Sequence, residues 1–196
     1  MQYQYPLNLS FKILALAPQI TITDASDRVI LYVKQKLFKL KEEVQVFSDV
    51  EKTNQVFTIN ADRVIDFSAR YNFSDQVGSS LGAVKRRGMK SLWKAHYDIF
   101  DGENPVLEIQ EENVMLRVAD GCLNSIPIVG AFSGYLLHPA YLVSRGETQT
   151  VMRFQKMLAL FEGKFKIEPQ AELNPVEENR VLLSLIMMIL LERARG

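Results

Sequence analysis

The chain has 196 residues, 47% of them hydrophobic, and its 23 lysine and arginine residues balance its 23 aspartate and glutamate residues. This composition excludes an intrinsically disordered chain, which would combine low hydrophobicity with a high net charge. The length favours a single domain over residues 1–196, and the zero net charge argues against a nucleic acid as partner.

The first six residues lack the basic region and the apolar stretch of a secretory signal. Cys122 is the only cysteine of the chain, so an intramolecular disulfide is excluded. A reducing compartment fits this composition, and we expect a cytoplasmic protein.

From residue 7 to residue 168, apolar residues recur with period two, which is typical of strands that turn one face toward a core. The alternation is most regular at residues 7–13, 93–99 and 161–168. Polar turn sequences separate the expected strands, among them residues 24–27, 101–104 and 144–146. We therefore expect antiparallel hairpins in one closed sheet. Residues 113–134 do not fit this pattern, and residues 112–120 are a candidate for a short helix.

A helix is expected from Pro175 to about Ala194. Asn174 is a good N-cap residue, proline is favoured at the first helical position, and Glu177 completes a capping pattern. Residues 181–191 contain one polar residue, Ser184, so these three turns offer no face to water.

Such a helix needs apolar surroundings, which are lipid, a partner protein or the rest of the chain. A bilayer span requires about 20 apolar residues, more than this segment has, so a stable transmembrane segment is the weaker interpretation. A closed sheet has an apolar interior to fill. The sequence thus predicts a mainly β fold, a closed antiparallel barrel around a central C-terminal helix.

Several segments resemble the LURP-one-related family, which belongs with the phospholipid scramblases to the tubby-like superfamily. They are residues 32–40, 82–87 with 91–93, 97–101 and 161–167, and their order along the chain carries the resemblance. The resemblance implies a barrel of about twelve strands around a central helix. It implies little about chemistry, because a fold does not determine a function.

The densest basic cluster of the sequence consists of Lys85, Arg86, Arg87, Lys90 and Lys94. Lysine and arginine bind phosphate groups well, so this cluster is a candidate site for an anionic phospholipid or a phosphoinositide, as in tubby proteins. The simpler alternative is the solvated end of a hairpin. A second cationic stretch spans residues 34–41, and its position beside the first cluster would strengthen the lipid hypothesis.

Metal sites have weaker signals. Asp98, Asp101 and Glu103 are candidate calcium ligands, but their spacing does not match an EF-hand loop and a hairpin turn explains them more simply. His96, His138 and Cys122 lack the spacing of a zinc site. We expect no resident metal and no cofactor.

Residues 78–82 match the G-x-S-x-G pattern of a hydrolase nucleophile at Ser80. The strand and helix that this motif requires are not expected around it, so a serine hydrolase is a remote alternative.

We expect a non-enzymatic binding or scaffold protein for an anionic lipid, a small ligand or a protein partner, cytoplasmic or peripheral at the membrane. The main alternative is a scramblase-like protein that inserts its C-terminal helix into lipid.

Overall fold

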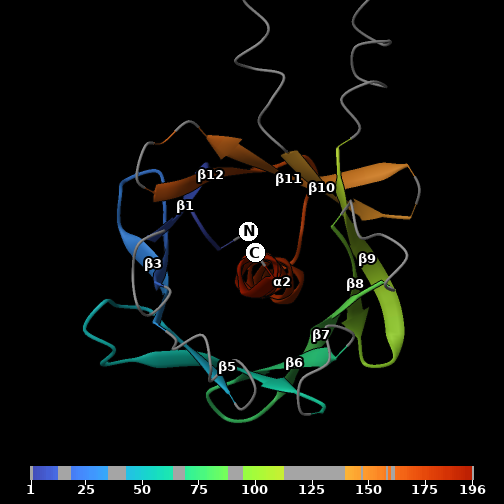
Figure 1. The fold of residues 1–196 in the computed structure, drawn as a ribbon, viewed down its shortest axis with the longest axis horizontal. Helices are drawn as coiled ribbons and strands as arrows, with labels where there is room; N and C mark the ends of the chain where they lie inside the picture. Colours follow the sequence, from blue (N-terminus) through green and yellow to red (C-terminus); the bar gives the residue numbers. More distant parts are fainter. Residues whose placement is uncertain are drawn as a thin grey trace, which may run out of the picture.

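The computed structural model describes residues 2–12, 19–34, 43–63, 69–87, 95–112, 140–146, 148–157, 159 and 162–195. These residues form a closed barrel in which every strand pairs with its neighbours along the chain and β1 pairs with β12 (Figure 1). All of the pairings are antiparallel. The strands are β1 (Leu7–Lys12), β2 (Gln19–Thr23), β3 (Val29–Lys34), β4 (Val44–Phe47), β5 (Gln55–Ala61), β6 (Arg70–Asp75), β7 (Ser80–Arg86), β8 (His96–Asp101), β9 (Asn104–Glu111), β10 (Ala140–Arg145), β11 (Gln149–Met157) and β12 (Glu162–Pro169).

The wall of the barrel follows the alternation seen in the sequence. Where β1 meets β12, Leu7 faces Ile167 and Leu9 faces Phe165, and all four side chains are buried. The pair between them joins Asn8 to Lys166 on the outer face. Because side chains alternate between the two faces of a strand, period-two hydrophobicity produces an apolar interior. The predicted mainly β fold is confirmed.

Helix α2 (Pro175–Arg195) begins where the capping sequence predicts. The side-chain Oδ1 of Asn174 accepts hydrogen bonds from the backbone N–H groups of Val176 and Glu177, each at 3.0 Å. In return, the carboxylate of Glu177 accepts a hydrogen bond from the backbone N–H of Asn174 at 3.3 Å. These reciprocal bonds satisfy N–H groups that a helix leaves free at its start.

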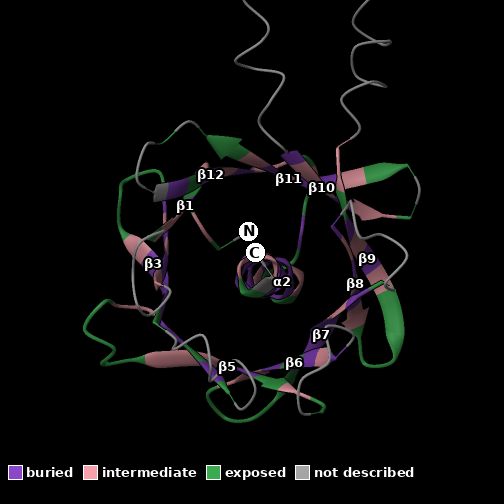
Figure 2. Ribbon diagram, viewed as in Figure 1, coloured by how far each residue is buried: buried purple, intermediate pink, exposed green. Residues whose placement is uncertain are grey.

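The helix runs through the interior of the barrel (Figure 1), and Figure 2 shows buried residues along the strands and along the helix. No side chain from Val181 to Leu191 is more than 6% exposed. Full burial of one aliphatic side chain of this size stabilises a fold by about 1.5–3 kcal/mol. The helix is therefore the centre of the hydrophobic core. Within the described part of the chain, no helix is long and apolar enough to cross a membrane.

Glycine and aromatic residues adapt the wall to the helix. Helix α2 lies closest to β6, β7 and β8, and Gly82 on β7 leaves the space for it, since a Cβ there would stand 2.6 Å from Nε of Arg180. The side of the barrel formed by β1, β11 and β12 carries large rings instead. The rings of Phe154 and Phe165 stack with centroids 4.3 Å apart, and Phe11 stacks on Phe165 at 6.1 Å.

The barrel has two ends, which we call the N-mouth, where α2 begins, and the C-mouth, where α2 ends. The hairpin turns after β2, β4, β6, β8 and β10 lie at the N-mouth, together with the segment between β12 and α2. The odd-numbered strands end at the C-mouth. Arg145 pairs with Glu177 at the N-mouth at 2.9 Å, while Arg193 donates to the backbone carbonyl of Lys12 at the C-mouth at 2.9 Å.

Candidate functional site

Strand β7 divides the basic cluster expected from the sequence between the two faces of the barrel wall. Arg86 departs from that cluster because it faces the interior, where it is 6% exposed and its Nε lies 3.5 Å from the carboxylate of Glu192. The alternation of the strand accounts for this, since Val84 and Arg86 share the inner face. Lys85 lies on the outer face and Arg87 follows directly at the C-mouth. Lys90 and Lys94 lie outside the described residues.

Arg87 is bound to acidic side chains of the neighbouring strands. Its Nη2 lies 2.6 Å and its Nε 3.1 Å from the two oxygens of Asp98, and its Nη1 lies 3.7 Å from Glu108. The hydrogen bonds to Asp98 raise the pKa of the Arg87 guanidinium. Lys85 pairs in register with the same Asp98. The described outer part of the basic cluster is therefore partly neutralised by acidic residues.

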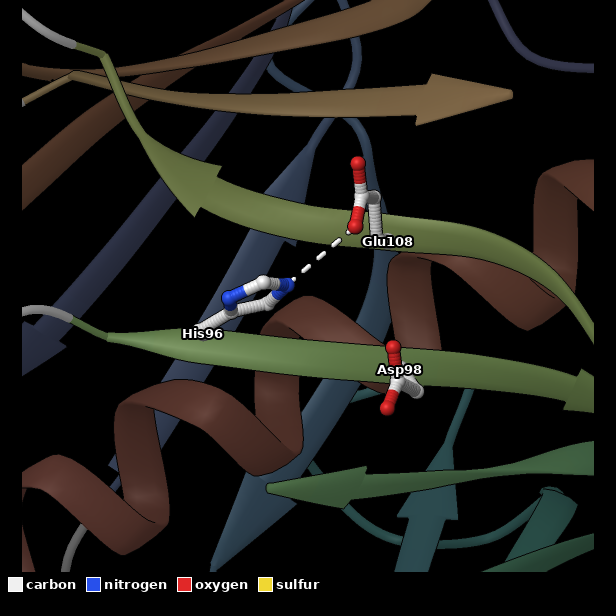
Figure 3. Close-up of side chains that lie close together, drawn as sticks. All are labelled: His96, Asp98 and Glu108. Atoms are coloured by element: carbon white, nitrogen blue, oxygen red, sulfur yellow. Dashed lines mark hydrogen bonds and ion pairs between the residues drawn. The ribbon is translucent and has the colours of Figure 1, made fainter. Parts of the chain in front are cut away.

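His96, Asp98 and Glu108 gather on the outer face of β8 and β9 (Figure 3). His96 and Asp98 are two residues apart on one strand, so they point the same way. The sheet register places Glu108 opposite Asp98. The imidazole Nε2 of His96 lies 3.2 Å from a carboxylate oxygen of Glu108. The sequence does not predict this group, because its one local signal, the His96-x-Asp98 spacing, is common in strands.

The three candidate calcium ligands are each engaged by a different arginine. Asp98 binds Arg87, Asp101 lies 3.0 Å from Nη2 of Arg180, and Glu103 lies 2.8 Å from Nη1 of Arg70. The other residues considered for a metal site, His138 and Cys122, lie outside the described residues.

Ser80 lies at the exposed start of β7, at the N-mouth. A strand follows it, whereas a hydrolase nucleophile requires a helix at that position. His96 stands opposite residue 87, seven residues along β7 from Ser80, a distance of about 23 Å at the usual strand rise. The described residues therefore place no histidine base beside Ser80.

The two mouths carry opposite charge. The exposed cationic side chains described at the C-mouth are Lys12, Lys34, Arg63, Arg87, Lys156 and Lys164, against the exposed acidic residues Glu43 and Asp62. At the N-mouth, the exposed acidic residues described are Asp27, Glu51, Asp101, Glu103 and Glu172, against the cationic Arg28 and Lys52. Lys34, the first residue of the second cationic stretch, lies at the C-mouth with Lys85 and Arg87, with three strands between them, and residues 35–41 of that stretch lie outside the described residues. Among the exposed side chains that the structure describes, positive charge thus predominates at the C-mouth and negative charge at the N-mouth.

A shallow cavity of about 410 Å³ lies on the N-mouth side of β3. It lies beside the most sparsely paired part of the wall, where β3 and β4 share a single register pair, Tyr32 with Phe47. Val29, Leu31 and Phe57 provide apolar lining, and Asn179 of the helix lies at its polar part. Asn179 accepts a hydrogen bond from the Tyr3 hydroxyl at 2.9 Å, and burial raises the pKa of Tyr3 to about 12, so this hydroxyl stays protonated. None of the residues predicted as a site lines this cavity.

Comparison with known proteins identifies relatives of this barrel. The sequence model of the LURP-one-related family matches residues 29–168. A crystal structure of an Arabidopsis thaliana protein aligns with a TM-score of 0.48 and 17% sequence identity, over 96% of this chain and 91% of that chain. A search of curated proteins found no significant match.

Proposed function

Because the chain belongs to the LURP-one-related family and fills its barrel with its own helix, we propose that it is a non-enzymatic binding protein that docks on anionic phospholipid membranes through the C-mouth. The observation that carries this proposal is the charge polarity of the barrel. Six exposed cationic side chains of the described residues lie at the same end of the barrel as the end of α2.

An anionic membrane attracts each lysine or arginine close to its surface by about 1 kcal/mol. The acidic N-mouth is repelled by the same surface, so the charge polarity orients the molecule with the C-mouth toward lipid. Met157, at the end of β11, adds an apolar side chain that is 43% exposed at this mouth. Lys85 and Arg87 lie at the edge of this surface. Docking of this kind makes the protein peripheral and leaves α2 in place.

The alternative in which the C-terminal helix inserts into lipid requires α2 to leave the barrel. Its side chains from Val181 to Leu191 are buried against the wall. Their removal would expose the apolar interior of twelve strands, which costs far more free energy than surface docking provides. The position of α2 therefore supports a peripheral protein over a scramblase-like one.

Flotation of the protein with phosphatidylcholine vesicles, with and without phosphatidylserine or a phosphoinositide, tests the proposal. We expect binding only to the anionic vesicles, and weaker binding as salt is added, because salt screens charges beyond about 10 Å at 0.1 M. Absence of binding to anionic vesicles at low salt would refute the lipid proposal.

A matched pair of charge reversals locates the docking surface. Lys34→Glu alters the C-mouth and Lys52→Glu alters the N-mouth, and both side chains are exposed. We expect Lys34→Glu to weaken vesicle binding by about fivefold or more, since about 1 kcal/mol is lost for each cation removed. Lys52→Glu should leave it unchanged. Equal effects of both variants would contradict docking through the C-mouth. If the protein bound an acidic protein and did not bind anionic vesicles, lipid docking would also be contradicted.

A further inference from the structure

The group formed by His96, Asp98 and Glu108 has the composition of a metal site. The three side chains come from neighbouring strands β8 and β9 and are half-buried on the outer face (Figure 3). One ligand atom from each residue lies within 4.8 Å of the other two. The two strands are paired along this stretch, so the backbone beneath the three residues is rigid.

We propose that His96, Asp98 and Glu108 bind a divalent transition-metal ion, with Zn²⁺ as the best fit. One imidazole nitrogen with two carboxylates is a ligand set that suits zinc, whereas calcium prefers oxygen ligands throughout. Three protein ligands leave one position of a tetrahedral zinc ion to water. This inference is independent of lipid docking.

The distance between the ligand atoms of His96 and Glu108 is close to the one that zinc requires. Tetrahedral zinc with bonds of about 2.0–2.2 Å holds its ligand atoms about 3.3–3.5 Å apart. Nε2 of His96 and the nearer oxygen of Glu108 are already 3.2 Å apart. The metal would take the place of the contact between these two atoms. The ligand atoms of the three residues lie within 4.8 Å of one another, so the carboxylate of Asp98 must leave Arg87 and move closer to the pair.

Arg87 is the competitor for this site. Its guanidinium forms two hydrogen bonds with Asp98 and approaches Glu108, so a cation already occupies the acidic side of the group. The side chain is 54% exposed and comes from the end of β7, where it can swing into solvent. A metal ion and this guanidinium cannot both bind Asp98 closely. Removal of Arg87 should therefore strengthen metal binding.

Titration of the full-length protein with Zn²⁺ by calorimetry, and with Co²⁺ by absorption spectroscopy, tests the proposal. We expect one ion per chain, with a Co²⁺ spectrum that lacks the charge-transfer band of a thiolate ligand and so excludes Cys122. His96→Ala should weaken binding at least tenfold, and Arg87→Gln should strengthen it by roughly tenfold. Glu103→Gln, in the turn beyond this group, is the control and should bind like the unchanged protein.

The direction of the Arg87→Gln effect distinguishes a metal site from an ion-pair cluster. Three results would overturn the proposal: equal metal affinity in the His96→Ala variant, weaker or unchanged binding in Arg87→Gln, or no bound ion in either the unchanged protein or Arg87→Gln. Circular dichroism of each variant establishes that the barrel is folded. The metal titrations contain no vesicles, so absence of metal binding would not contradict the lipid proposal. Absence of vesicle binding would likewise not contradict the metal site.

Discussion

At Gly82 the wall of the barrel and the central helix approach so closely that no side chain fits between them. The residue has a φ of +119°, and a Cβ would stand 2.2 Å from the carbonyl oxygen of Phe100. On the helix side it would meet Arg180, whose Nε donates to the carbonyl of Leu81 at 2.6 Å. Gly82 therefore sets how closely α2 lies to β7.

We expect Gly82→Ala to destabilise the protein by about 3 kcal/mol or more, because it combines an unfavourable φ with overpacking against backbone. Gly102→Ala is the matched control. Gly102 also has a positive φ, of +54°, but open space surrounds its Cβ position, so its cost should be about 1–2 kcal/mol. Urea unfolding measures both values. Equal destabilisation would mean that the close approach of Phe100 and Arg180 to Gly82 contributes nothing.

Among the elements, the hairpin turns after β2, β4 and β6 at the N-mouth are closed in the same way. Asp24, Asp49 and Asp75 each accept hydrogen bonds from backbone N–H groups of their own turn. These bonds satisfy N–H groups that would otherwise lack partners, and they hold the turn closed. The aspartates thus contribute to the stability of the barrel as well as to the negative charge of this mouth.

Acid should weaken these turns. Hydrogen bonds from the backbone N–H groups of Thr53 and Asn54 hold the pKa of Asp49 below its ordinary value of 3.8. Burial would raise the pKa of Asp24, but hydrogen bonds from the backbone of Arg28 and Ser26 and from the Arg28 guanidinium lower it overall. The unfolded chain then binds protons first as the pH falls. The stabilisation is present above pH 3.8 and is lost as the pH drops through the lower pKa of the folded state.

Urea midpoints measured from pH 6 to pH 2 test this prediction. We expect Asp49→Asn to unfold more easily near neutral pH and to lose part of the acid sensitivity of the unchanged protein. Glu51→Gln alters an exposed residue of the same turn and should retain that sensitivity. If Asp49→Asn kept the full pH dependence, the turn aspartates would not be its source.

For the whole molecule, the direction of α2 agrees with the charges at the two mouths of the barrel. The N-terminus of a helix carries partial positive charge and its C-terminus partial negative charge. Here the helix begins among the acidic residues of the N-mouth and ends among the cationic residues of the C-mouth. The charges of the wall therefore complement the helix dipole, and the helix connects the two mouths through an apolar interior.

Leu185→Asp should unfold the entire domain. Leu185 is 0% exposed at the middle of the central helix. Burial of an unpaired charge there costs more than the whole free energy of unfolding of a domain of this size. Val176→Asp introduces the same charge on the same helix at a position that is 46% exposed, and it should fold normally. Circular dichroism and limited proteolysis measure the outcome. A folded Leu185→Asp variant that lost only membrane attachment would contradict the buried position of α2.

The local sequence determined the elements of this protein because their signals are local. Strand alternation, turn residues and the cap at Asn174 each depend on residues within one turn or strand, and the described strands and the cap lie where the sequence places them. Residues 113–120 of the candidate short helix lie outside the described residues. The helix inside the barrel was also predictable, because an apolar helix and a sheet with one apolar face can bury their surfaces only against each other. The inward direction of Arg86 follows from the same alternation, although Lys85, Arg86 and Arg87 form one continuous basic run.

Tertiary structure alone decided which charges meet. The register of β7, β8 and β9 brings Arg87 to Asp98 and Glu108 to His96, and a shift of one residue would move every one of these side chains to the opposite face. Closure of the barrel likewise collects the ends of alternate strands at each mouth, so that residues as distant as Lys12 and Lys156 share one charged surface. Pairing between strands depends on contacts across the whole sheet, and no short stretch of sequence contains that information.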